Sequence, residues 1–82
     1  MTQPEILSRL QTVFDDVFLD PVTVTPTLIA KDVGEWDSLL HVSLIIAIEK
    51  AFKLRFRVGE VETTRNLGEL ADLIGKHLGA AA

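Results

Sequence analysis

The stretch Gly34-Glu35-Trp36-Asp37-Ser38-Leu39 marks the point where a long loop gives way to a helix. Aspartate is among the best residues for capping a helix, since its carboxylate accepts hydrogen bonds from the first backbone N–H groups. We therefore place a helix start at Asp37 or Ser38 and expect this helix to run to about Phe52. The Ser38 hydroxyl then lies in the first helical turn.

A serine in this position can be an attachment point as well as a capping residue. The start of a helix offers unpaired N–H groups and the positive end of the helix dipole, so it favours a phosphate. Ser38 could thus anchor an arm through a phosphodiester instead of acting as a catalyst. The alternative is an ordinary unmodified serine, with Asp37 as a plain N-cap.

The helix that begins here is apolar on two faces. At about 100° per residue, the face predicted to meet the core consists of His41, Leu44, Ile45, Ile48 and Phe52. The nearly opposite face consists of Leu39, Val42 and Ile46. A small domain has little room to bury a helix on both sides, so the second face is predicted to be a partner surface. Burial of this face in the core is the alternative.

A further amphipathic helix is predicted on each side of this segment. Residues 3–18 carry apolar side chains at helical spacing, and Thr2 with Glu5 forms a capping box at their start. Residues 67–78 show the same spacing. Asn66 and Glu69 are the expected capping pair of the last helix, Gly79 is its expected end, and residues 79–82 are expected to be a frayed tail.

The connection at residues 19–37 is long for a compact domain, and such loops are often functional. Residues 22–25 are β-branched and could form a strand, but no other segment offers them a partner. Leu28 and Ile29 are expected to pin the loop to the core. A single helical turn around residues 60–64 would be a short third helix. The predicted fold is therefore a small all-α four-helix bundle, with three main helices and one short one.

Composition narrows the possible functions. The 82 residues are expected to form a single domain, and a hydrophobic fraction of 48% supports a real core. The absence of cysteine excludes thiol enzymes and thiolate zinc sites. No apolar run approaches the roughly 18 residues needed to cross a bilayer, and the start lacks a signal peptide, so we expect a cytoplasmic protein without membrane insertion. Two isolated histidines and no carboxylates at ligand spacing argue against a metal site.

The charge is divided unevenly along the chain. The net charge of −4 argues against nucleic acid as a partner. Residues 1–37 hold seven acidic and two basic residues, a net of −5, whereas residues 38–82 hold five acidic and six basic residues, a net of +1. Four of the basic residues lie within residues 50–57. This basic cluster is either a solvated face or a contact for an acidic partner.

The motif Asp37-Ser38-Leu39 at a helix start, after a long loop ending near Gly34, resembles the acyl carrier proteins. The likeness extends to the spacing of apolar residues and to the acidic residue near the end of that family's second helix. The matching positions are Val42, Leu44, Ile48, Glu49 and Phe52. The final helix and its short leading turn also fit, so the resemblance covers roughly residues 5–78.

This resemblance implies a carrier and not an enzyme. Ser38 would receive 4′-phosphopantetheine from coenzyme A through a phosphopantetheinyl transferase, and the thiol of that arm would hold an acyl group as a thioester. Its other partners would be acyl-transferring or acyl-activating enzymes of a fatty-acid, polyketide or related specialised pathway. The residues expected to be recognised by the transferase and these enzymes are Asp37, Leu39, Leu40, Val42, Ile46 and Glu49. The carrier is expected to be a monomer.

The likeness is incomplete on the partner face. Typical fatty-acid carriers are rich in acids there, matching basic patches on their enzymes, but this chain has Leu40 and Ser43 where acids are common. Lys50 follows Glu49 directly, and Trp36 stands where small residues are common. These departures indicate a dedicated carrier with a more apolar docking face.

Two alternatives remain from the sequence. The chain could be an aminoacyl or hydroxyacyl carrier charged by a dedicated adenylating ligase, or an unmodified helical adaptor that docks through the second apolar face. A nucleophile–base pair of Ser38 and His41 is disfavoured, because the sequence has no Gly-x-Ser-x-Gly elbow and no evident oxyanion hole. We expect His41 at the edge of the core and Trp36 as a lid that packs the loop onto the bundle.

Overall fold

The computed structural model describes residues 2–81 and is all-helical over that range. Its three α-helices of 15 residues each are α1 (Gln3–Val17), α2 (Ser38–Phe52) and α3 (Leu67–Ala81). Two 3₁₀ turns, η1 (Ala30–Asp32) and η2 (Val61–Thr63), lie in the connections. The predicted all-α fold is confirmed, but the short third helix expected near residues 60–64 is the 3₁₀ turn η2. The bundle therefore has three helices.

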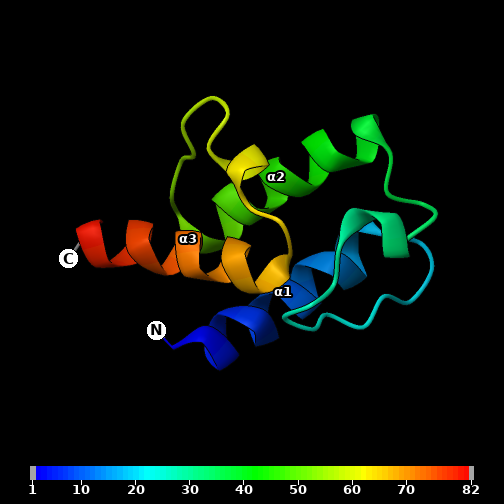
Figure 1. Ribbon diagram of the computed structural model, residues 1–82, viewed down its shortest axis with the longest axis horizontal. Helices are drawn as coiled ribbons and strands as arrows, with labels where there is room; N and C mark the ends of the chain where they lie inside the picture. The colour runs from blue at the N-terminus through cyan, green and yellow to red at the C-terminus, as the bar shows by residue number, and fades with distance from the viewer. Residues whose placement is uncertain (1, 82) are drawn as a thin grey trace.

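The first helix, α1, is the one against which the other two pack (Figure 1). It starts with the predicted capping pair, since the N–H and the hydroxyl of Thr2 lie 3.2 and 2.9 Å from the Glu5 carboxylate. These hydrogen bonds lower the pKa of Glu5. The carboxylate thus stays ionised at the helix start, where a negative charge interacts favourably with the positive end of the helix dipole.

One apolar core joins the three helices. It contains Ile6, Leu10, Val13, Phe14, Phe18, Leu44, Ile48, Phe52, Val61, Leu67, Leu70, Ala71 and Ile74. The predicted core face of α2 is confirmed at Leu44, Ile48 and Phe52, which are buried. His41 and Ile45 are half-buried at the edge of the core.

The long connection between α1 and α2 is fastened by side chains and contains no strand within residues 2–81. Gln11 on α1 takes the place of a missing strand partner for the β-branched segment. Its side chain donates to the Val22 carbonyl at 2.7 Å and accepts from the Val24 N–H at 2.8 Å. Leu28 is half-buried against the core as predicted, whereas Ile29 is 36% exposed and does not pin the loop.

The last helix begins as predicted but ends later. The Glu69 N–H donates to Asn66 Oδ1 at 2.9 Å, while the Glu69 carboxylate accepts from the Arg65 N–H at 3.2 Å. The expected end at Gly79 is wrong, because α3 continues to Ala81 and residues 79–81 are helical instead of frayed. Gly79 does not adopt the positive φ with which a glycine usually ends a helix. Residue 82 of the expected tail lies outside the described residues.

The two described ends of the chain lie on the same side of the molecule, and the Ser38 end of α2 lies far from both (Figure 1). Within residues 2–81, no helix is both long enough and apolar enough to span a membrane.

Candidate cofactor-attachment site

The start of α2 is built by the residue that precedes Ser38. Asp37 Oδ1 accepts a hydrogen bond from the Leu40 N–H at 2.8 Å, and the Asp37 carbonyl accepts one from the His41 N–H at 2.9 Å. The predicted capping role of Asp37 is therefore confirmed. The N–H groups of Ser38 and Leu39 precede this first helical bond and lie at the open end of the helix. The Ser38 side chain is exposed at the same end.

This end of α2 fits a phosphate diester. The N–H groups of Ser38 and Leu39, together with the positive end of the dipole of a 15-residue helix, favour a negative group beside the Ser38 oxygen. The Asp37 carboxylate is held by the Leu40 N–H. The site thus supplies an accessible hydroxyl and a favourable field without any metal ligand, and residues 2–81 contain no cluster of side chains that could hold a metal ion.

Trp36 closes the loop over the core next to this site. Its indole stacks on the His41 ring with centroids 6.0 Å apart and meets Phe14 and Phe18 edge-on at 5.5 and 5.7 Å. The predictions that Trp36 is a lid and that His41 lies at the core edge are confirmed.

The indole also determines what the imidazole of His41 can do. Trp36 Nε1 donates to His41 Nδ1 at 3.1 Å, so the proton of the neutral ring is on Nε2. The ring then has no second acceptor nitrogen with which to take a proton from Ser38. The geometry therefore favours a positioning role for His41 in the loop over a role as a general base.

The second apolar face of α2 is open to solvent. Leu39 is 79% exposed, Val42 56% and Ile46 47%, so the alternative in which this face is buried in the core is wrong. Leu40, by contrast, is half-buried and packs against the core. The recognition of these residues by other enzymes remains a prediction.

A solved structure is similar to almost the whole chain. It is the solution NMR structure of the holo acyl carrier protein from Geobacter metallireducens, which is 36% identical, with a TM-score of 0.75. The alignment covers 98% of this chain and 88% of that one. This chain belongs to the acyl carrier proteins. A scan against protein-family models and a search of curated proteins each found no match.

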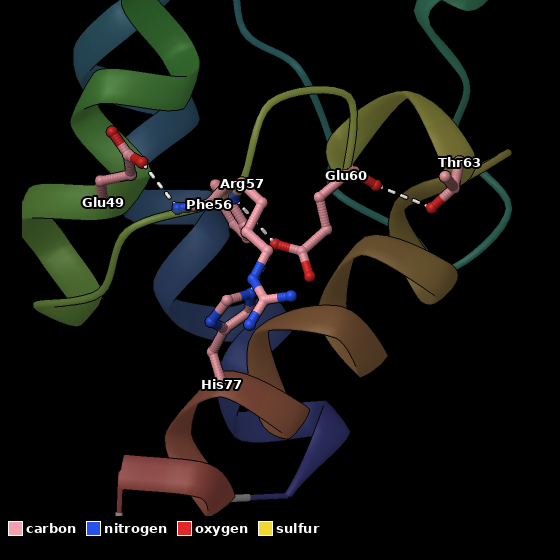
Figure 2. A network of polar contacts seen from close by, with 6 residues as sticks. All are labelled: Glu49, Phe56, Arg57, Glu60, Thr63 and His77. Carbon is pink, nitrogen blue, oxygen red and sulfur yellow. Dashed lines mark hydrogen bonds and ion pairs between the residues drawn. The ribbon is translucent and has the colours of Figure 1, made fainter.

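In this carrier, the acidic residue at the end of α2 has a structural contact that the sequence did not reveal. Glu49 is half-buried, and its Oε2 accepts a hydrogen bond from the Phe56 N–H at 2.8 Å (Figure 2). The helix ends just before, where Lys53 adopts a left-handed conformation with φ 54°. Glu49 thus holds the segment that follows α2 back against the helix. Its predicted role in partner recognition is untested.

A tight turn carries this segment over to α3 (Figure 2). The Arg57 N–H donates to Glu60 Oε1 at 3.0 Å. Gly59 adopts a positive φ of 81°, a backbone conformation that is strained for residues with a side chain. His77 Nε2 lies 2.7 Å from the same Glu60 oxygen. The Arg57 N–H and then His77 lower the pKa of Glu60. One carboxylate therefore closes the turn and ties it to the last helix.

The carrier also contains a cavity of about 150 Å³. It lies between α2, the loop that precedes it and the first turn of α3. Its walls include Trp36, His41, Ile45, Leu28, Leu67 and Leu70. The same indole and imidazole that position the loop thus form part of the wall of this half-open pocket.

Proposed function

We propose that this chain carries acyl intermediates as thioesters on a 4′-phosphopantetheine arm attached to Ser38, with residues 1–82 as one carrier domain. The observation that carries the proposal is the exposed Ser38 hydroxyl at the start of α2, beside the capping Asp37, in a chain that belongs to the acyl carrier proteins. The similar solved structure is that of a holo carrier, which supports an arm on this chain as well.

In the loading step, the Ser38 oxygen forms a bond to the phosphorus nearest the pantetheine of coenzyme A. The bond from that phosphorus to the oxygen of the 3′,5′-ADP portion breaks, and the hydroxyl proton passes to the transferase or to water. The arm brings its own thiol, so a chain without cysteine can still form a thioester. Ser38 and the open end of α2 hold the resulting phosphodiester.

The partners we propose are a phosphopantetheinyl transferase and acyl-transferring or acyl-activating enzymes of a fatty-acid, polyketide or related specialised pathway in the cytoplasm. They would recognise Asp37 and the exposed side chains that follow it on α2. Support comes from three large apolar side chains that face solvent within three turns of Ser38, because folding alone gives no reason for their exposure.

The test is the intact mass of the protein after incubation with coenzyme A and a broad-specificity phosphopantetheinyl transferase. We expect one added arm on the wild type and on Ser43→Ala, and none on Ser38→Ala. Ser43 is a matched control because it is also an exposed serine of α2. An arm on Ser38→Ala would overturn the site, and a folded wild type that takes no arm would favour the unmodified adaptor. An acyl or an aminoacyl group on the native arm would then separate the two kinds of carrier.

A further inference from the structure

The exposed apolar face of α2 continues across a groove onto the segment that follows the helix. A groove of about 300 Å³ separates α2 from residues 56–62, and its walls include Val42, Ile46 and Val58. Val58 is fully exposed at the tip of the turn held by Glu60. We call Leu39, Val42, Ile46 and Val58 the α2 docking face.

The stripe on α2 ends in positive charge. Lys50 follows Ile46 by four residues, which places it on the same side of the helix as the apolar stripe. Lys53 is the left-handed residue directly after α2, so it lies at the same end of the helix as Lys50. Both lysines are exposed, as are Arg55 and Arg57 in the segment that follows. Lys50 stands about 18 Å along the helix from Ser38, at a rise of 1.5 Å per residue.

Little negative charge offsets these bases. Residues 38–59 contain four basic residues and one acidic residue, a net of +3, and that acid is Glu49, whose carboxylate is bound to the Phe56 N–H. Glu60 is likewise bound, by Arg57 and His77. Glu62 on η2 is an exposed carboxylate at the rim of the groove. The end of the docking face away from Ser38 is therefore basic.

We propose that the enzyme surface that docks on this carrier is apolar and carries carboxylates where it meets Lys50 and Lys53. A surface rich in Lys or Arg would place like charges together at this end, which costs affinity and slows encounter. A partner surface with carboxylates there would bind more tightly and associate faster. The apolar part of the same partner surface would cover the α2 docking face. This inference rests on the proposed function and names the chemistry of the partner.

The test uses two synthetic helical peptides that share one leucine face and differ in the flanking residues, which are Glu in one peptide and Lys in the other. Each is titrated into the ¹⁵N-labelled 82-residue carrier with its arm attached, and amide shifts are followed. At low salt we expect the Glu peptide to bind at least about tenfold more tightly, a difference of about 1.4 kcal/mol. It should shift the amides of the α2 docking face. The preference should fade near 1 M salt, where the screening length falls to about 3 Å.

Matched charge reversals separate this face from the net charge of the molecule. Lys50→Glu with Lys53→Glu should abolish or reverse the preference for the Glu peptide. Arg9→Glu with Lys31→Glu changes the net charge equally on exposed positions of α1 and η1, and it should keep the preference. Amide spectra of both double variants check that the fold is retained.

Three results would overturn the inference. The first is equal or tighter binding of the Lys peptide, and the second is the absence of shifts on the α2 docking face with either peptide at millimolar concentration. The third is a concentration-dependent dimer that covers this face, because a second copy would then be its occupant. If the protein accepts the arm on Ser38 but gives any of these results, the proposed function stands and only the inference about the partner surface is overturned.

Discussion

The helices α1 and α2 have the same length but use their apolar residues differently. Every large apolar side chain of α1 is buried or half-buried, whereas α2 leaves Leu39, Val42 and Ile46 exposed. The core needs only one face of α2, because apolar residues of α1, η2 and α3 form the rest of that core. The large apolar residues of α1 therefore all contribute to the packing of the fold, whereas those of α2 are divided between the core and a solvent-exposed surface.

The proposed difference between the two helices would be contradicted most directly if the same leucine-to-alanine substitution destabilised the protein equally in both. Leu10 on α1 is fully buried, and Leu39 on α2 is 79% exposed. Leu10→Ala should lower the free energy of unfolding by about 2–5 kcal/mol, because it leaves a cavity. Leu39→Ala should change it by no more than about 0.5 kcal/mol. Urea unfolding of both variants measures the contrast, and a comparable loss from Leu39→Ala would place that side chain in the core.

A charge on the outward face should affect recognition and not folding. Leu39→Asp should lower kcat/KM for loading by the phosphopantetheinyl transferase about tenfold, a loss of about 1.4 kcal/mol. Thr12→Asp adds the same charge at an exposed position of α1 and should leave kcat/KM unchanged. If Leu39→Asp unfolds the protein or both variants load at the wild-type rate, the outward face is not a recognition surface.

The Trp36 lid links the two helices, since it contacts Phe14 and Phe18 on one side and His41 on the other. Trp36→Phe keeps a ring in place but removes the hydrogen bond to His41 Nδ1, and should cost about 1 kcal/mol. Chemical denaturation gives this cost, and ¹⁵N shifts of the imidazole should show a loss of the fixed Nε2–H tautomer. An unchanged tautomer in the variant would show that the indole does not determine it.

The smallest effect concerns the turn that faces α2 across the groove. Because the folded pKa of Glu60 lies below its ordinary value of 4.5, its ionised form stabilises the fold at neutral pH. That contribution is complete above about pH 4.5 and is lost as the pH falls through the folded pKa. The stability difference between wild type and Glu60→Gln should therefore shrink below pH 4.5. Glu62→Gln is the control, and a difference that stays constant down to pH 2 would contradict this linkage.

The predictions that held concern interactions within a few residues or a repeating pattern. The caps at Asp37 and Asn66 join groups at most three residues apart, so sequence alone placed both helix starts. The two faces of α2 followed from helical periodicity. The end of α3 was missed because a glycine can stop a helix or continue in it, and Gly79 keeps a helical φ.

The interactions that were missed join segments through side chains and backbone groups with no pattern in the sequence. Gln11 binds Val22 and Val24, which are 11 and 13 residues away, and nothing in the composition of α1 marks that glutamine. Glu49 was assigned to partner recognition, and its contact with the Phe56 N–H depends on how the chain reverses after Lys53.

The positions of the three main helices, their N-terminal caps and the place of Ser38 in the first turn of α2 follow from the sequence, because these depend on local hydrogen bonds and on the period of apolar residues. Which carboxylates near α2 are hydrogen-bonded is known only from the folded structure. Nothing in the sequence marks Glu49 or Glu60 as hydrogen-bonded. In the structure, the Glu49 carboxylate accepts a hydrogen bond from the Phe56 N–H, and the Glu60 carboxylate contacts both the Arg57 N–H and His77. The basic cluster after Ile46 is visible in the sequence, but whether the nearby carboxylates offset its charge depends on where the chain folds back, because hydrogen bonds between distant residues have no local sequence pattern.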